Sequence, residues 1–346
     1  MPLNLIAQEP FQDKEKTPLL VFKKNKIYDK KIIDIIDYFS EGDVMVFNQV
    51  KVIKAKLSGV IERSSALINF NLDQEINNGI WQALCRPAKK INKNDRIILS
   101  QNFFCSVIDK DNEGFIKIQF YLNDKILSGE FLYQALEIYG DTPIPPYIKR
   151  DAKKKYSDEK NYQTIYANNG AAVAAPTAGL HFNENLFKKI KEKNIKCVFL
   201  TLNVGAGTFL PVRTENLQHH KMHSEKYILS PENCEIINNA KNNGKKIIAV
   251  GTTSLRALES SLDINGILQP QDRFTNIFIY PPYNFNAVDV LMTNFHLPKS
   301  TLFMLVCAFV GYDNAFEIYQ HAIQNKYRFY SYGDCSLLFK PNPISK

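Results

Sequence analysis

The pattern of expected strands changes once along the chain, and this change limits the fold more than any other feature. From Val50 to Tyr121 the sequence has short runs rich in β-branched and aromatic residues, separated by turn signals such as Asp111-Asn112-Glu113-Gly114. After Tyr162, expected strands alternate with expected helices. Regular short strands are typical of a small barrel or sandwich, whereas strand–helix alternation favours a parallel sheet. We therefore predict an α/β fold with a mixed, largely parallel sheet and flanking helices, plus an inserted small antiparallel β-barrel domain.

This pattern divides the chain into three segments. Residues 1–55 are expected to form the first part of the α/β domain, residues 56–148 the inserted barrel, and residues 149–346 the main part of the α/β domain. Five apolar residues of 32–39 share one helical face. The expected strands are 44–47, 50–53, 67–70, 97–99, 103–108, 115–122, 195–202, 247–250 and 276–280, and the further helices are 184–194, 231–243, 253–261, 301–310 and 314–325.

Composition excludes several classes of protein. With 346 residues, 45% hydrophobic and 23% charged, the chain has the mix of a packed two-domain protein and differs from disordered, collagen-like and disulfide-stapled chains. Its six cysteines form no Cys-x-x-Cys pair, which indicates reduced thiols of a cytoplasmic protein. The longest apolar run, 302–310, is too short to span a membrane, and the first twenty residues do not resemble a signal peptide. We expect a soluble monomer without a membrane partner.

The positive charge of the chain is concentrated in one segment. The net charge is +8, and residues 149–196 hold eleven Lys or Arg against five Asp or Glu. Such a segment is either a solvated lysine surface or a patch that binds phosphates, where Lys and Arg displace counterions.

Three turns of small and hydroxylated residues adjoin expected strands or helices. They are 174–181, 203–208 and 251–254. In open α/β sheets, ligands bind where strands end beside helix N-termini, and free N–H groups there suit carboxylate or ribose oxygens. Each turn alone is also explained by tight backbone geometry and helix capping. Neither a dinucleotide fingerprint nor a P-loop is present.

Two polar segments contain candidate catalytic side chains. His219 and His223 have the i,i+4 spacing of zinc ligands on a helix, but no acidic or cysteine cluster joins them, so substrate binding or proton transfer by His223 and Glu225 is the better hypothesis. Residues 289–301 combine Asp, Thr, Asn, His, Lys and Ser beside a hydrophobic helix. These groups must bond to one another or to a ligand, although helix caps and a satisfied core histidine would also explain them.

Long strings of this sequence resemble the S-adenosylmethionine:tRNA ribosyltransferase-isomerase family of queuosine biosynthesis. The resemblance runs from Leu5 to about Leu338. Its most specific strings are Ala-Ala-Pro-Thr-Ala-Gly-Leu-His-Phe at 174–182 and Thr-Asn-Phe-His-Leu-Pro-Lys-Ser-Thr at 293–301. Shorter matching strings are 42–48, 162–167, 204–213, 222–225, 250–256 and 327–334.

The resemblance implies transfer of the ribosyl part of S-adenosylmethionine to 7-aminomethyl-7-deazaguanine at the tRNA wobble position. Rearrangement then gives epoxyqueuosine, and adenine and methionine are released. S-adenosylmethionine is thus a consumed cosubstrate, with no true cofactor and no metal, and the partner is tRNA carrying the modified base. The sulfonium acidifies the C5′ carbon, so a base must remove a proton there, an acid must help adenine to leave, and the amine must attack unprotonated.

This chemistry selects the candidate residues. The catalytic candidates, with roles unassigned, are His181, His223, Glu225, Asp289 and His296. The expected cosubstrate-binding residues are Thr177, Gly205, Gly207, Thr208, Thr252, Thr253 and Ser254. Contacts to tRNA phosphate or to the methionine carboxylate are expected from Lys149, Arg150, Arg213, Arg256 and Lys299.

The sequence departs from the family pattern at a few positions and leaves two alternatives open. Asn203 stands where the family usually has His. A catalytic role of that histidine would therefore be lost in this chain or is not essential. A tRNA-binding protein without catalysis would keep the basic segment, and a metal-dependent hydrolase would use the His219–His223 region. Binding of tRNA without the cosubstrate would favour the first alternative, and sensitivity to chelators would favour the second.

Overall fold

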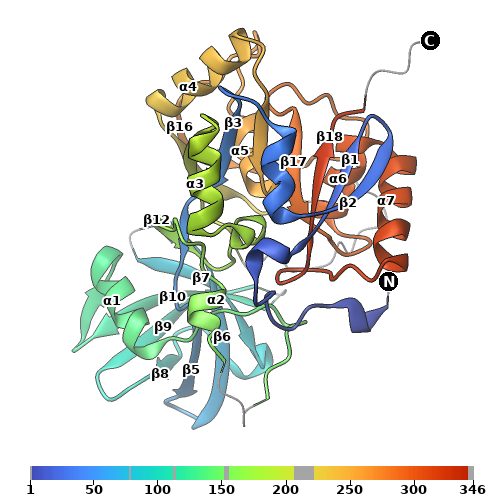
Figure 1. Cartoon of the computed structure of the whole chain (residues 1–346). Coiled ribbons are helices and arrows are strands. Elements are labelled where there is room, and N and C mark those ends of the chain that lie inside the picture. The colour runs from blue at the N-terminus through green and yellow to red at the C-terminus, as the bar shows by residue number, and fades with distance from the viewer. Residues whose placement is uncertain (1, 78, 112–113, 152–155, 206–221, 342–346) are drawn as a thin grey trace.

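The computed structural model describes the chain except for residues 1, 78, 112–113, 152–155, 206–221 and 342–346. Within the described residues the chain forms two parts, a large mixed sheet with helices and a smaller barrel (Figure 1). The chain begins in the sheet part, enters the barrel and then returns to complete the sheet. This confirms the predicted α/β fold with a β-barrel in it. The exact domain boundaries stay a prediction.

The large sheet has nine strands in its described part. In spatial order they are β16 (Gln271–Thr275), β14 (Glu225–Leu229), β13 (Lys196–Leu202), β3 (Val44–Asn48), β15 (Ile247–Val250), β17 (Val290–Asn294), β18 (Cys335–Phe339), β1 (Pro18–Lys23) and β2 (Lys26–Lys31). The central run β13-β3-β15-β17 is parallel, as is β18–β1, whereas the remaining pairs are antiparallel. The sheet is therefore mixed, with a parallel centre.

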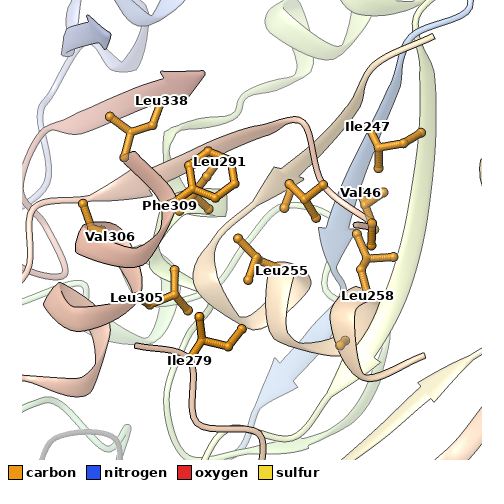
Figure 2. Packing of buried hydrophobic residues seen from close by; sticks show 14 of the residues in the cluster. Val46, Ile247, Leu255, Leu258, Ile279, Leu291, Leu305, Val306, Phe309 and Leu338 are labelled. Carbon is orange, nitrogen blue, oxygen red and sulfur yellow. The ribbon is translucent and has the colours of Figure 1, made fainter. Parts of the chain in front are cut away.

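Alternate residues of the central strands bury opposite faces of the sheet. Val44 and Val46 belong to a core with α4 (Pro231–Asn242), α5 (Thr252–Ser260), α6 (Thr301–Val310) and α7 (Tyr312–Gln324). Figure 2 shows part of this core, where Val46 faces Leu255 and Leu258 of α5. Met45 and Phe47 belong to the other core, with α3 (Glu184–Glu192) and the 3₁₀ helix η3 (Ile32–Tyr38). Burial on both faces explains why these strands read as continuous apolar runs.

The barrel closes on itself. Its six strands, in order around the described barrel, are β5 (Lys56–Ile61), β6 (Ala66–Asn77), β7 (Ile80–Arg86), β10 (Phe115–Leu122), β9 (Phe103–Lys110) and β8 (Arg96–Ile98). A short strand β11 (Lys125–Leu127) pairs with β10, and α1 (Gly129–Tyr139) contributes Leu132, Ala135 and Leu136 to the barrel core. Closure leaves no free edge among the six strands, so the small sheet needs no partner.

Helix caps agree with the sequence-based expectations. Ser230 caps α4, its side chain accepting from the Asn233 N–H, and Pro231 follows at the first helical turn. Ser300 caps α6 in the same way through the Phe303 N–H. The remaining short elements are η1 (Leu3–Leu5), η2 (Lys14–Lys16), η4 (Ala88–Lys90), η5 (Thr177–His181), α2 (Asp158–Asn161), β4 (Val50–Val52) and β12 (Asn169–Ala172).

Some expected elements were wrong. Residues 276–280 form no strand, because the ladder ends at β16 and the apolar side chains of Ile277 and Ile279 pack instead on the α5 side of the sheet. The strand at β4 pairs with β12 and lies outside the barrel. The expectations missed the sheet strands β1, β2, β14, β16, β17 and β18, the barrel strands β5, β7 and β11, the short strand β12 and the helix α1.

In the described part of the chain, no single helix has the length and apolar composition to cross a membrane. The pair α6 and α7 together has that length and composition, but the chain bends by 114° between the two helices.

Candidate functional site

A cavity lies at the carboxyl edge of the parallel strands. We call it the first cavity. It is lined by the loops that follow β15 and β17, by the segment that leads into η5, and by the final turn before β18. Its described lining is Tyr147, 174–178, Val204, 251–253, 293–300, Leu302, Tyr330 and Ser331. Residues of all three turns singled out in the sequence, with only Val204 from the turn 203–208, thus line one site with the 293–301 segment, as expected for an α/β sheet.

Strand pairing explains why these loops meet. β15 and β17 are parallel neighbours, with Val250 beside Met292, so the chain leaves both strands at the same edge. Gly251 then has a φ of 92°, which favours glycine, and α5 starts immediately after it. Lys299 also has a positive φ of 61° at the exposed rim of the cavity. Such backbone is found where surrounding structure holds it in place.

His296 lies in the wall of the first cavity. Its Nε2 is 2.8 Å from the Thr293 hydroxyl, and its backbone N–H donates to the Tyr319 hydroxyl at 3.0 Å. Burial lowers the pKa of His296 to about 4. The imidazole is therefore neutral near pH 7, in the form that can accept a proton.

His181 lies behind the first cavity and contacts it through Asn294. The Asn294 amide nitrogen is 3.3 Å from Nε2 of His181. Burial, with Lys14 and Arg328 nearby, lowers the pKa of His181 to about 3. His181 therefore serves as a neutral hydrogen-bond partner in the protein interior rather than as a group in the cavity.

The buried His181 predicts acid sensitivity of the fold. Its pKa falls from 6.5 to about 3 on folding, so the unfolded chain binds the extra proton between these values. The contribution to stability is complete above pH 6.5 and is lost as the pH falls toward 3. We expect the free energy of unfolding to drop by about 2 kcal/mol more in the parent protein than in His181→Gln between pH 7 and pH 5. Urea unfolding at both pH values measures this, and parallel pH dependence of the two proteins would contradict it.

A second cavity lies between the barrel and the sheet. Its described lining combines barrel residues 73–77, Trp81 and Tyr133 with Ala171, Asn203, Gly205, 223–226 and Phe274. His223 and Glu225 enter it from the start of β14, while Asp73 and Glu75 come from β6. Val204 lines the first cavity and Gly205 the second, so the two cavities adjoin where the chain leaves β13. A side chain at position 205 would come within 2.7 Å of an Asp73 carboxylate oxygen, which explains the glycine.

Glu225 forms a buried ion pair with Arg256 of α5. The side chains of both residues are 6% exposed, and Nη1 of Arg256 donates to Oε2 of Glu225. Nε of Arg256 donates to the Ile277 carbonyl at 3.3 Å. Arg256 therefore supports Glu225 from inside the protein, and it does not line either cavity.

The structure places the expected site residues in four groups. The first cavity is lined by Thr177, Thr252, Thr253, His296 and Lys299, and the second by Gly205, His223 and Glu225. Inside the protein, near these cavities, lie His181, Ser254 and Arg256. Neither cavity is lined by Asp289, Lys149 or Arg150. Outside the described residues lie Gly207, Thr208, Arg213, His219 and His220.

Two of these positions change the candidate set. Asp289 immediately precedes β17, at the end opposite to the first cavity, where its carboxylate accepts from the Ile247 N–H at 2.8 Å. This is a structural duty, and we do not keep Asp289 among the catalytic candidates. The hydroxyl of Ser254, on the first turn of α5, donates to the carbonyl of Val250 at the end of β15, and Ser254 does not line the first cavity.

Sequence reasoning missed several lining residues. Asn294 is in the segment 289–301, which the sequence analysis singled out for its many polar side chains. These neighbouring polar residues were the feature that could have identified it. The barrel residues Asp73, Glu75 and Trp81 had no such signal, because they sit in an ordinary strand pattern. Among the described residues, no three His, Cys, Asp or Glu side chains are grouped so that they could hold a metal ion.

The fold and the two adjoining cavities define a two-domain α/β protein with one site at a strand edge and another between its domains. The family described as queuosine biosynthesis protein matches residues 1–338. The S-adenosylmethionine:tRNA ribosyltransferase-isomerases of Rickettsia bellii and Rickettsia conorii are 45% and 44% identical to this chain, each over 98% of it and 97% of their own length. The crystal structure of an S-adenosylmethionine tRNA ribosyltransferase from Thermotoga maritima matches with a TM-score of 0.54 and 30% identity, over 98% of both chains.

The chain belongs to the S-adenosylmethionine:tRNA ribosyltransferase-isomerase family. This confirms the resemblance seen in its sequence.

Proposed function

We propose that this chain transfers the ribosyl part of S-adenosylmethionine to 7-aminomethyl-7-deazaguanine in tRNA and isomerises it to epoxyqueuosine, with release of adenine and methionine. Besides family membership, one observation carries the proposal. The two adjoining cavities have different charge: the described lining of the first holds no Asp or Glu, whereas the second holds Asp73, Glu75 and Glu225. The uncharged cavity suits the neutral adenine ring of S-adenosylmethionine, whereas the acidic cavity suits the cationic sulfonium and the aminomethyl group before it loses its proton.

S-adenosylmethionine is assigned to the first cavity. Its lining is mostly apolar and includes a few polar groups, as is common for small-molecule sites. Thr252 and Thr253 offer hydroxyls, and the start of α5 offers backbone N–H groups. Lys299 at the rim has the charge to attract the methionine carboxylate. Thr177 contacts the cavity from η5.

The modified base of the tRNA is assigned to the second cavity. Its carboxylates attract the cationic aminomethyl group and the sulfonium, which would approach each other where Val204 and Gly205 join the cavities. Because the amine must lose a proton before it attacks, His223 and Glu225 are the proposed proton acceptors on this side. His296 is the proposed base on the cosubstrate side, since its neutral imidazole can accept a proton.

The tRNA backbone is assigned to the basic surface around Lys149. Lys149 is exposed, whereas the Arg150 guanidinium is held by both oxygens of Asp158, at 2.6 and 2.7 Å, and by the Gln8 carbonyl. Lys149 is therefore the better phosphate contact, and Arg150 shapes the surface. Phosphate contacts of this kind position the tRNA without specifying its sequence. We propose that a monomer acts, with S-adenosylmethionine consumed and with no metal ion or other cofactor required.

A single assay tests the proposed activity. The purified protein is incubated with S-adenosylmethionine and tRNA carrying 7-aminomethyl-7-deazaguanine, without added metal, and the digested nucleosides are analysed by mass spectrometry. We expect epoxyqueuosine together with free adenine, only when both substrates are present and also in the presence of a chelator. Binding of tRNA without product would contradict the proposal.

Asn203 offers a comparison within the same assay. It lines the second cavity, and its side-chain oxygen accepts from the Ala171 N–H at 3.4 Å. The variant Asn203→His restores the usual family residue. If Asn203 weakens the parent enzyme, the variant should be more active than the parent. If the enzyme works without a histidine at this position, the two proteins should be equally active.

A further inference from the structure

One side chain of the first cavity is held in a single orientation by the protein. The Asn294 amide nitrogen faces the carbonyl oxygens of Tyr330, Ser331 and Gly333 at 3.1 to 3.5 Å, and also Nε2 of His181. An amide oxygen turned toward three carbonyls would be repelled by them. The nitrogen therefore must occupy this side, and the oxygen must point the other way.

The oxygen of the same amide lacks a partner. Asn294 is 2% exposed and lines the first cavity, yet its Oδ1 accepts no hydrogen bond from any described residue. Buried polar atoms are nearly always paired, and an unpaired one is costly. A side chain fixed so firmly with an empty acceptor is suited to receive a donor from a ligand.

The surroundings narrow the choice of donor. An ammonium group as the donor to the buried Oδ1 would need a carboxylate beside it, and the described lining of the first cavity contains none. The lining instead includes Ala174, Ala175, Pro176 and Phe295, which suit a flat, neutral ring. In S-adenosylmethionine the neutral aromatic part is adenine, and its exocyclic 6-amino group is a hydrogen-bond donor.

A second unpaired group of the first cavity is on α5, the helix that follows the neighbouring strand β15. Thr253 also lines the first cavity, and its buried hydroxyl has no partner within the described part of the chain. It follows β15, which is paired with the strand that carries Asn294. A hydroxyl donor and a fixed amide acceptor that line one cavity complement adenine, in which the 6-amino group donates and the ring nitrogens accept.

We infer that Asn294 determines cosubstrate specificity by accepting a hydrogen bond from the adenine 6-amino group. His181 acts as a positioning residue in this arrangement, since it helps to hold the amide nitrogen away from the cavity. The inference rests on the proposed function, because it takes S-adenosylmethionine as the ligand of the first cavity.

Equilibrium binding tests the inference without the chemical step. Calorimetry compares S-adenosylmethionine with its purine analogue, in which hydrogen replaces the 6-amino group. We expect the parent protein to bind the analogue on the order of 10- to 100-fold more weakly, because the analogue leaves Oδ1 unpaired. Equal dissociation constants in the parent protein would overturn the inference, and this measurement depends on no variant.

Two variants extend the test. Asn294→Ala is expected to bind both compounds with dissociation constants that agree within about threefold, since only the 6-amino contact distinguishes them. The matched control is Asn325→Ala, an exposed position at the end of α7, which should keep the parent's preference. A folded Asn294→Ala protein that still prefers S-adenosylmethionine as strongly as the parent would overturn the inference.

The outcome also separates this inference from the proposed function. Epoxyqueuosine formation combined with equal binding of the two compounds would overturn only the assignment of Asn294. Absence of both product and S-adenosylmethionine binding would overturn the two proposals together.

Discussion

Replacement of His296 by Ala is expected to lower kcat by about 10²- to 10⁴-fold, the usual contribution of a positioned acid or base. The reason is its place in the first cavity, where Thr293 and Tyr319 contact its ring and its backbone N–H, respectively. With a pKa of about 4, the imidazole is neutral at the working pH. Steady-state formation of epoxyqueuosine, with saturating S-adenosylmethionine and tRNA, measures the effect on kcat.

The same substitution at a surface histidine serves as the control. His321 on α7 is bonded to Asp29 at 2.9 Å and lines neither cavity. His321→Ala should leave kcat within about twofold of the parent value, since surface changes away from a site have small effects. If His296→Ala keeps kcat within threefold of the parent, His296 has no part in proton transfer.

Replacement of Arg256 by Met is expected to lower the free energy of unfolding by about 3–5 kcal/mol, the cost of leaving one partner of a buried ion pair alone. The Glu225 carboxylate would then remain inside the protein, where its side chain is 6% exposed. In the double variant Arg256→Met with Glu225→Gln, no charge of this pair is left buried. We expect it to recover at least half of the lost stability. Urea unfolding of both variants measures this.

An exposed ion pair gives the matched comparison. Lys16 and Asp13 lie 2.9 Å apart with side chains 67% and 48% exposed, and Lys16→Met should cost less than about 1 kcal/mol. If Arg256→Met also lost less than about 1 kcal/mol of unfolding free energy, the expected cost of breaking the buried ion pair would be contradicted. The result also bears on catalysis, because a loss of activity in a Glu225 variant reports on proton transfer only if the variant remains folded.

Much of the fold could be predicted from local pattern. The apolar runs of β3 and β15 and the Ser230-Pro231 start of α4 are signals carried by neighbouring residues, and each was confirmed. The strand β17 was not predicted, because its polar residues Thr293 and Asn294 made the segment read as a site loop. Residues 276–280 carry a similar alternation but form no strand, because the ladder ends at β16, and a sequence pattern does not say where the edge of a sheet lies.

The candidate site was predicted only in part. Loops that follow parallel strands can be expected to meet, and 251–253 and 293–300 do line one cavity. Asp289 and His296 belong to the same polar segment of the sequence. The strand β17 lies between them, so they are at opposite ends of this strand. Proximity along the chain therefore did not mean proximity in the site.

The amino-acid sequence by itself determined the family of this protein and the general type of its fold, because long specific strings and hydrophobic periodicity are properties of neighbouring residues. Only the tertiary structure decided how the candidates divide between two cavities. Asp73 of the barrel lines the same cavity as His223 and Glu225 from the start of β14, and the amide of Asn294 is turned by the carbonyls of Tyr330 and Gly333. These contacts join residues far apart in the chain, and packing and hydrogen bonding between separate elements create them.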